Sequence, residues 1–483
     1  MGSEGYRAVE KNFTVMVTKE VVVAAVLPLQ EHWLPLSNLD LLLPPLDVGV
    51  FFCYDKPAAT NGTAVVAALK KGLAEALVSF YALAGEVVTN SAGEPELLCN
   101  NRGVDFVEAE ADVDLRSINL YNPDESIEGK LVPQKKHGVL AIQATFLKCG
   151  GLIVACSFDH RIADAYSANM FLVSWAHLAQ SAQPIKPTIN TLPSRPCFRR
   201  SLLCPRRPGR IPPSIDGIYV PVSELPPPKQ PSTEPESDPV ISRIYYITVD
   251  QLNHIQSLAN SSGTKAVADG VKRTKLESFC AFLWRMVAAS VKGKRVTTRM
   301  GIVVDGRSRL INIGGEKQKA SLMGSYFGNV LSLPYGEKSA RELTEKSLSW
   351  VADEVHKFLE DAVTEEHFLG LVDWVEAHRP GGAVAKIYIG GGGEGEEDDV
   401  PAFVVSSGQR FPEEKVDFGW GRPVFGSYHF PWGGNAGYVM PMPSPAGNGD
   451  WVVYMHLQKG QLEKIESEAG HVFTPLTWDY LVH

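Results

Sequence analysis

The chain has 483 residues, more than a single hydrophobic core usually supports, and this length predicts two domains. Apolar residues make up 44% of it, but no apolar run approaches the roughly 20 residues of a membrane span, so we expect a globular protein without one. The formal net charge of −9 argues against nucleic-acid binding, which requires a basic face, and favours a small-molecule partner.

The N-terminus and the cysteines indicate the compartment. The first residues, MGSEGYRAVEKNF, contain no apolar core of a secretory signal. Seven cysteines are scattered along the chain without a single C-x-x-C pair, a pattern unlike that of zinc sites or disulfide frameworks. We therefore expect a cytoplasmic protein that holds no metal and keeps its cysteines reduced and mostly buried. We also expect a monomer.

The first part of the chain alternates short apolar runs with a long helical pattern. Residues 12–26 and 48–54 are rich in Val and Phe, which predicts strands. Residues 63–80 repeat apolar groups three and four positions apart, the period of a helix. Residues 138–160 hold two short apolar runs separated by glycines at 150–151, which predicts two buried strands joined by a turn. Helical and strand patterns alternate thereafter, so the predicted fold class is α/β.

A proline-rich crossover linker at 191–240 separates the two predicted domains. Repeated proline removes backbone donors and fixes φ, so we expect no regular structure in this stretch. Residues 1–190 are assigned to the N-terminal domain and residues 241–483 to the C-terminal domain.

Two charged segments fall outside the expected elements. A group of arginines in the linker could bind a phosphate or act as a nuclear localisation signal, but the favoured interpretation is that they lie on a solvent-exposed face of the linker. Residues 390–399 are rich in glycine and then acidic, which indicates a surface insertion. The arginines are Arg195, Arg199, Arg200, Arg206, Arg207 and Arg210.

The most informative stretch surrounds His160. An apolar run at 151–158 ends in Asp159-His160, and apolar residues then recur at helical spacing, so His160 is predicted at a strand-to-helix junction. Side chains at such junctions reach a cleft while the sheet holds their backbone. Asp164, four residues on, is close enough to orient the histidine or to brace the loop. On this spacing alone, a histidine hydrogen-bonded within a core would be the better interpretation.

Several other chemistries fail on the sequence. The glycines at 390–395 satisfy G-x-G-x-x-G, but the acidic residues around them would repel a pyrophosphate. The triplet at 417–419 spells the kinase D-F-G, yet no H-R-D-x-x-x-x-N is present, and no G-x-S-x-G suggests a serine hydrolase. Cys156 precedes His160 on the predicted strand, and a buried structural thiol is favoured over a nucleophile there.

The chain resembles the BAHD acyltransferases, whose signatures are His-x-x-x-Asp near the middle and Asp-Phe-Gly-Trp-Gly near the end. This sequence has HRIAD at 160–164 and DFGWG at 417–421. The resemblance implies a two-domain, coenzyme A-dependent acyltransferase fold, similar to chloramphenicol acetyltransferase, with an active-site channel between the domains. Further similar stretches are LSNLD at 36–40, FYALAGE at 80–86, CNNRGVDFVEA at 99–109, VDGRSR at 304–309 and YFGN at 326–329.

The resemblance also implies roles for individual residues. His160 would be the general base, and acyl-CoA would be a co-substrate rather than a permanently bound cofactor. Asp164 would point away from the substrate and pair with Arg307. Thr274 matches a polar position that helps to hold coenzyme A. A structural brace outside the chemistry would be formed by Asp417, Gly419 and Trp420.

The acceptor implied by the resemblance is a small alcohol, of aromatic or phenylpropanoid type. Two alternatives stay open: an amine or polyamine acceptor, and a non-catalytic member of the fold that only binds. Gly408 departs from the family, since many relatives carry tryptophan there, on the acceptor side. Acceptor contacts of relatives therefore do not transfer to this chain.

Overall fold

The computed structural model describes nearly the whole chain, including both family motifs. The acidic segment predicted at 390–399 lies outside the described residues. The described residues are 13–57, 61–181, 195–225, 238–261, 272–291, 296–311, 321–389, 400–432 and 436–482.

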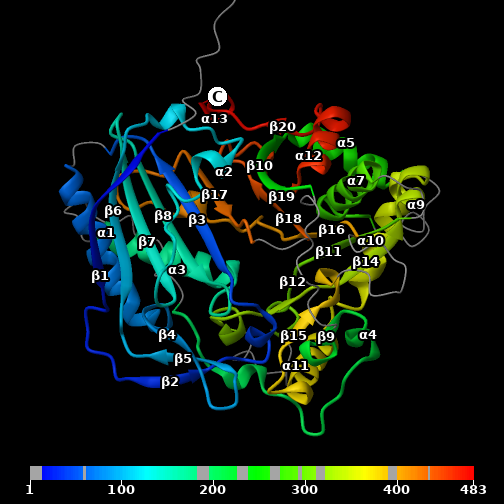
Figure 1. Ribbon diagram of the computed structural model, residues 1–483, viewed down its shortest axis with the longest axis horizontal. Coiled ribbons are helices and arrows are strands. Elements are labelled where there is room, and N and C mark those ends of the chain that lie inside the picture. The colour runs from blue at the N-terminus through cyan, green and yellow to red at the C-terminus, as the bar shows by residue number, and fades with distance from the viewer. Residues whose placement is uncertain are drawn as a thin grey trace, which may run out of the picture.

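The first sheet is built mainly from the N-terminal part of the chain (Figure 1). Its strands confirm the predictions at 12–26 and 48–54, and the two apolar runs within 138–160 form an antiparallel hairpin. The six strands, in spatial order, are β1 (Val15–Val23), β6 (Val104–Ala111), β7 (Leu140–Leu147), β8 (Leu152–Asp159), β3 (Asp47–Tyr54) and β17 (Phe425–His429).

Two helices pack against each other beside this sheet, α1 (Gly62–Ser79) and α3 (Ala165–Ser181). Asn61 caps α1, because its side chain accepts a hydrogen bond from the amide of Ala64. The indole of Trp175 in α3 donates to the carbonyl of Leu69 in α1 at 2.9 Å, which satisfies a buried polar group between the helices. The apolar residues of both helices join those of the sheet in one core.

The second sheet holds residues from 240 onwards, and its helices pack over it to form a second core. The strands, in spatial order, are β14 (Tyr335–Ser339), β11 (Thr297–Ile302), β16 (Ala402–Val405), β18 (Gly437–Pro443), β19 (Trp451–Gln458), β10 (Val240–Ile247) and β20 (Thr474–Pro475). The helices are α5 (Val249–Ala259), α7 (Lys275–Ser290), α9 (Ala340–Glu345), α10 (Leu348–Glu360) and α12 (Lys459–Ala469). Together the two sheets and their helices give the α/β class that the sequence predicts.

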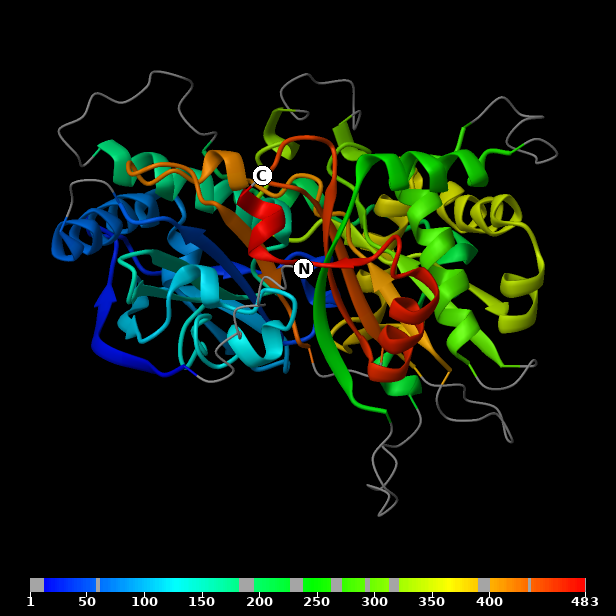
Figure 2. The same cartoon turned by 90° about the horizontal axis from the view of Figure 1, so that it is seen from above.

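One strand of the C-terminal part of the chain lies in the first sheet. Strand β17 pairs antiparallel with β3, with Phe425 opposite Cys53 and His429 opposite Gly49. In Figures 1 and 2 the orange strands run between the two halves of the molecule. The two halves are therefore joined by a shared sheet as well as by the linker.

The stretch at 191–240 contains short regular elements, so the expectation of no regular structure there is wrong. Strand β9 (Tyr219–Pro221) pairs with β15 (Ala383–Ala385). Proline is tolerated at the positions where it occurs here. Pro213 is at the start of a helix, where its missing N–H is not needed, and Pro221 is the last residue of β9, which belongs to a sheet of only two strands. The other short elements are η4 (Arg200–Leu203), α4 (Pro213–Asp216) and η5 (Val222–Glu224).

Two arginines of the linker are not part of a solvated face. Arg206 donates to the Asp373 carboxylate at 2.7 Å and to Glu366 at 2.8 Å, and Asp373 belongs to α11 (Glu365–His378). Arg200 donates to the carbonyl of Phe327 at 2.6 Å. These two side chains fasten the linker to the C-terminal part of the chain, which corrects the interpretation of the cluster as solvated.

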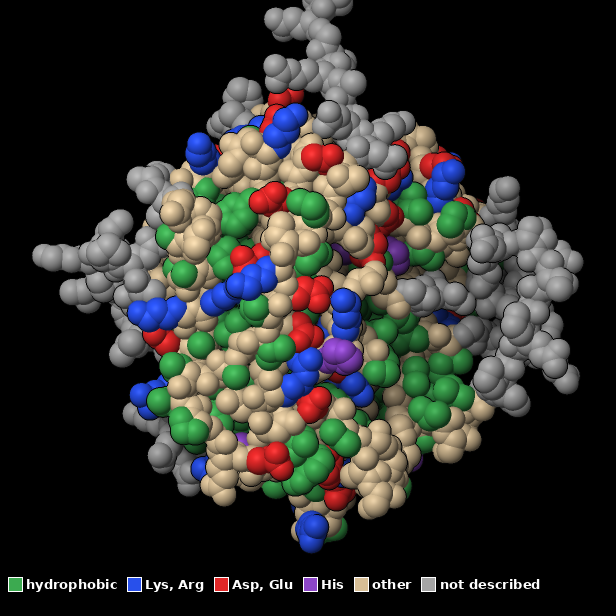
Figure 3. Space-filling model, turned by 60° about the vertical axis from the view of Figure 1, so that its left-hand side comes forward, with side chains coloured by type: hydrophobic (Ala, Val, Ile, Leu, Met, Phe, Trp, Pro, Cys, Tyr) green, Lys and Arg blue, Asp and Glu red, His purple; other side chains and the backbone are tan. Residues whose placement is uncertain are grey.

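The cysteines and the charged surface agree with the sequence. All seven cysteines are free, and Cys53, Cys99, Cys156 and Cys280 are buried. On the face drawn in Figure 3, basic and acidic side chains are interspersed, without a broad basic patch among the coloured residues. Within the described parts of the chain, no helix combines the length and the apolar character needed to cross a lipid bilayer.

Candidate active site

His160 lies at the junction that the sequence predicts, between the end of β8 at Asp159 and the start of α3 at Ala165. Its backbone N–H donates to the carbonyl of Leu46 at 2.8 Å. The side chain is partly exposed, and its ring centroid is 6.3 Å from that of Phe430, in an edge-to-face arrangement. Nδ1 is buried without a hydrogen-bonding partner among the described residues.

Asp164 points away from His160 and toward Arg307. The guanidinium donates two hydrogen bonds to the carboxylate, Nη1 to Oδ2 at 2.7 Å and Nη2 to Oδ1 at 3.0 Å. The carboxylate also accepts from the amides of Ser167 at 2.9 Å and Val330 at 3.3 Å. With Asp164 1% exposed and Arg307 3% exposed, this is a buried, two-pronged ion pair.

Arg307 reaches this position through a short antiparallel pair, β12 (Val304–Asp305) with β13 (Leu331–Ser332). Its Nη2 donates to the Gly328 carbonyl at 2.8 Å, and its guanidinium stacks 4.5 Å from the ring of Tyr166. Burial opposes the charge, but the nearby carboxylates outweigh it and raise the pKa of Arg307. Arg307 is therefore a permanent cation, and the Asp164 carboxylate stays paired with it.

Two residues that contact the backbone around His160 have no role assigned from the sequence. The side chain of Asn329 donates to the carbonyls of His160 at 2.9 Å and Arg161 at 3.1 Å. Asp40, at the start of η1 (Asp40–Leu42), accepts from the amide of Asn329 at 2.7 Å. The family-like segments LSNLD and YFGN contain these residues, but only the fold shows that they meet beside His160.

The DFGWG segment forms a turn that leads into β17. Oδ1 of Asp417 accepts from the backbone amides of Gly419 at 2.7 Å and Gly421 at 3.0 Å. Gly419 has φ of 104°, which a side chain would strain. Phe418 is fully buried, and its ring lies 4.7 Å from Trp175 and 5.6 Å from Trp420. None of these contacts involves His160.

Thr274 is exposed and caps the N-terminus of α7. Its hydroxyl accepts from the amide of Glu277 at 3.2 Å, and its own amide donates to the Glu277 carboxylate at 2.7 Å, which together form a capping box. Nδ1 of His356 donates to the other carboxylate oxygen of Glu277 at 2.6 Å. The structure does not bring Thr274 into contact with the residues around His160, and its role toward coenzyme A stays a prediction.

The side chains of neighbouring residues leave no room for a side chain at Gly408. A Cβ at this position would be 2.5 Å from Cγ of Met442 and 2.9 Å from Cγ of Met440. Both methionines are buried on β18. A tryptophan could not be accommodated here without moving them, so the methionines take the space that the aromatic ring would need.

The thiol of Cys156 is unsuited to nucleophilic chemistry. It is 2% exposed within β8, and burial raises its pKa above the ordinary range of a thiol. This agrees with its interpretation as a structural residue. In the described parts of the chain, no three His, Cys, Asp or Glu side chains are grouped so as to hold a metal ion.

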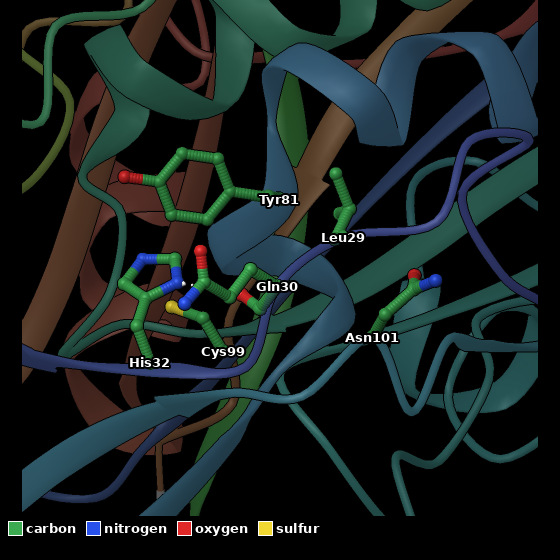
Figure 4. Close-up of a pocket in the computed structure, with 6 residues that line it drawn as sticks. All are labelled: Leu29, Gln30, His32, Tyr81, Cys99 and Asn101. Carbon is green, nitrogen blue, oxygen red and sulfur yellow. Dashed lines mark hydrogen bonds between the residues drawn. The ribbon is translucent and has the colours of Figure 1, made fainter.

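A small cavity lies elsewhere in the N-terminal part of the chain, beside β2 (His32–Pro35) and β5 (Pro95–Cys99) (Figure 4). Its volume is about 270 Å³. None of its lining residues is a predicted site residue; they are Leu29, Gln30, His32, Tyr81, Cys99 and Asn101.

Comparison with known proteins places the whole chain in one family. The family model described as the Transferase family matches residues 13–472. Shikimate O-hydroxycinnamoyltransferase of Nicotiana tabacum is 27% identical over 92% of this chain and 96% of the relative. Rosmarinate synthase of Plectranthus scutellarioides is 28% identical, over 89% of this chain and 93% of the relative. Putrescine hydroxycinnamoyltransferase 1 of Oryza sativa is 26% identical, over 85% and 88%.

Solved structures share the fold. Vinorine synthase superposes with a TM-score of 0.65 at 19% identity, covering 96% of this chain and 99% of that one. TRI101 of F. sporotrichioides, complexed with Coenzyme A and T-2, gives a TM-score of 0.67 at 14% identity, covering 92% and 99%. With the family model, the relatives and the fold in agreement, the chain belongs to the BAHD acyltransferases, a family that transfers acyl groups from acyl-CoA.

Proposed function

We propose that this protein transfers an acyl group from acyl-CoA to the hydroxyl of a small aromatic or phenylpropanoid alcohol, with His160 as the general base. The observation that carries the proposal is the environment of His160. Its imidazole is partly exposed and free of Asp164, while the buried pair of Asp164 with Arg307 holds the turn beneath it. A proton acceptor held within hydrogen-bonding reach of the hydroxyl is what acyl transfer to an alcohol requires.

The proposed reaction needs one proton acceptor and no covalent enzyme intermediate. The neutral imidazole of His160 accepts the acceptor's hydroxyl proton as the oxygen attacks the thioester carbonyl. A new C–O bond forms, the carbonyl oxygen becomes an oxyanion, and the C–S bond then breaks as the carbonyl is restored. His160 returns its proton to the departing coenzyme A thiolate. The products are an ester and free coenzyme A.

The supporting residues take the roles that their contacts favour. We infer that Asp164 and Arg307 fix the turn carrying His160, and that Asp417, Gly419 and Trp420 brace the entry to β17. Thr274 remains our candidate for a contact with coenzyme A. The two substrates would reach His160 through a channel between domains divided at 191–240. We further propose that the protein acts in the cytoplasm as a monomer.

An amine acceptor is the alternative within the same chemistry. Relatives include a putrescine hydroxycinnamoyltransferase and a 5-hydroxyanthranilate N-hydroxycinnamoyltransferase, both covering most of this chain at 26–27% identity. At this identity the relatives support acyl transfer but do not distinguish the acceptor atom. A protonated polyamine would require carboxylates beside the substrate to balance its charge.

The test is a donor-by-acceptor screen in which release of the coenzyme A thiol is measured. Acetyl-CoA and hydroxycinnamoyl-CoA are each offered with aromatic alcohols, aryl amines and polyamines. Turnover with an aromatic alcohol supports the proposal, and faster turnover with amines would replace it by N-acylation. Binding of acyl-CoA without thiol release from any pair would instead indicate a non-catalytic member of the fold.

A further inference from the structure

Asn329 holds the backbone of the turn that carries His160. Its Nδ2 donates to the carbonyl oxygens of His160 at 2.9 Å and of Arg161 at 3.1 Å. Asn329 itself is 0% exposed, so the donor side of these bonds is shielded from solvent. The amide thus contacts two successive peptide groups without touching the imidazole.

Asp40 holds Asn329 in turn. Its Oδ1 accepts from the backbone amide of Asn329 at 2.7 Å and from Nδ2 at 3.0 Å. Its Oδ2 accepts from the amide of Ser37 at 2.8 Å and from the hydroxyl of the same residue at 2.7 Å. Asp40 is also 0% exposed, and these donors, with the Arg200 guanidinium 3.9 Å from Oδ2, compensate its buried carboxylate. The Asp40 carboxylate therefore fixes both the backbone and the side chain of Asn329.

The same turn is held from other directions. The amide of His160 donates to the Leu46 carbonyl at 2.8 Å, and the amide of Arg161 donates to the Asp159 carboxylate at 3.0 Å. The residue after Asn329, Val330, donates its amide to Asp164 at 3.3 Å. One short segment thus contacts both the start of the turn at His160 and its end at Asp164.

We infer that Asp40 and Asn329 are positioning residues for the general base, an inference that rests on the proposed function. Asp164 and Arg307 fix the end of the turn, whereas Asn329 fixes the carbonyls at its start. Without the amide, two partly buried carbonyls lose their donor, and the turn is free to shift toward another donor. A displacement of about 1 Å at a catalytic group can cost on the order of 100-fold in rate.

The test is Asn329→Leu, which keeps the shape of the side chain and removes both donors. We expect kcat to fall about 10- to 100-fold, with little change in the KM for acyl-CoA. The matched control is Gln143→Met. Gln143 is also buried, at 6% exposed, and its amide donates to the Lys130 carbonyl at 2.8 Å and to the Thr145 hydroxyl at 2.9 Å, neither of which belongs to the turn. The control is expected to lower the thermal midpoint while kcat stays at the wild-type value.

A second measurement separates positioning from general destabilisation. In a His160→Ala background, Asn329→Leu should cause no further loss of kcat, because the group it positions is gone. An equal loss in both backgrounds, or wild-type kcat in the single variant, would overturn the inference. If Asn329→Leu does not fold, Asn329→Ser keeps one donor and should give an intermediate kcat, and Asp40→Asn should lower kcat in the same direction. Full turnover in His160→Ala alone would refute the proposed function instead.

Discussion

The two family motifs are both turns attached to the first sheet, but their side chains have different neighbours. The segment at 160–164 follows β8 and presents a partly exposed imidazole above a buried ion pair. The segment at 417–421 leads into β17, and its carboxylate accepts only backbone amides of its own turn. Its aromatic rings pack against α3 and β3. Two equally clear sequence signatures therefore have different surroundings, a partly exposed imidazole beside an ion pair in one turn and backbone and aromatic contacts in the other.

This contrast explains why a motif cannot be assigned a role from its residue types. Asp164 and Asp417 are both aspartates of a signature. Asp164 pairs with the buried Arg307, and when Asp164 is lost the guanidinium keeps, among the described residues, only the more exposed Asp305, at 3.2 Å, as a counter-charge. Asp417 accepts hydrogen bonds within its own turn. Because Asp417 is only partly buried, water can replace part of these hydrogen bonds when the side chain is removed. Removing each side chain should therefore give different losses in turnover and in stability.

The largest loss of turnover is expected for His160→Ala. General-base catalysis is worth about 10²- to 10⁴-fold, so thiol release should fall by that factor. The thermal midpoint and the affinity for acyl-CoA should stay close to wild type, because the side chain is partly exposed and makes no hydrogen bond through Nδ1 within the described structure. Steady-state kinetics and calorimetric binding check the two halves of this prediction. Wild-type turnover would remove His160 from the mechanism.

Asp164→Asn should reduce both turnover and stability. Breaking a buried ion pair on one side costs about 3–5 kcal/mol when the remaining charge has no other partner, and the loss should be smaller here because Asp305 stays 3.2 Å from the Arg307 guanidinium. The free energy of unfolding from denaturant titration measures this loss.

The matched comparison is a double-mutant cycle with Arg307→Gln. Because neither charge is then left without a partner, the double variant should lose less stability than the two single losses added together. Strictly additive losses would show that the two side chains do not interact. Normal stability with abolished turnover in Asp164→Asn would make Asp164 a direct partner of the histidine.

Asp417→Ala is expected to lower stability with little effect on turnover. The amides of Gly419 and Gly421 lose a charged acceptor, which is worth about 1.5–3 kcal/mol for a buried bond and less here because the turn is partly exposed. Asp417→Asn keeps an acceptor oxygen and should lose less. Thermal midpoints and kcat, measured on the same preparations, check both variants. A large fall of kcat in a stable Asp417→Ala protein would place this turn in the chemistry.

The smallest effect on turnover is expected for Glu413→Gln, beside the second motif. Burial raises the pKa of Glu413 to about 8, and Oε1 has no partner among the described residues. The folded state therefore holds this proton more tightly than the unfolded state, whose pKa is about 4.5. The stabilisation from Glu413 is present below about pH 4.5 and is lost as the pH rises through about 8.

The glutamine stays neutral and should remove this dependence. Relative to wild type, Glu413→Gln should gain in thermal midpoint as the pH is raised from 5 to 9, which a scan in matched buffers measures. A difference that does not change with pH would show that Glu413 is ionised in the folded protein at every pH in this range.

The sequence predicts four strands of the first sheet, and the resemblance to the family implies the pairing of Asp164 with Arg307. Alternating apolar runs and the glycines at 150–151 are local signals, so strands and turn follow from them. The contact of Asn329 with His160 is not local, since 169 residues separate the two side chains along the chain. The pairing of β17 with β3 is also not local. The residue pattern at 425–429 does not indicate which strand this segment pairs with. The filling of space around Gly408 by methionines depends on packing between β16 and β18.

Strand β17 also affects how the N-terminal half of the protein would behave without the C-terminal half. It covers the outer edge of β3, whose residues Val50, Phe51 and Phe52 are at most 1% exposed. An N-terminal fragment ending in the linker would present that edge as a row of unpaired amides and carbonyls flanked by large apolar side chains. Such an edge is a template for pairing with another chain, so the isolated fragment would be prone to aggregate. Covalent continuity through 425–429 thus protects the half that carries His160 from association with its own copies.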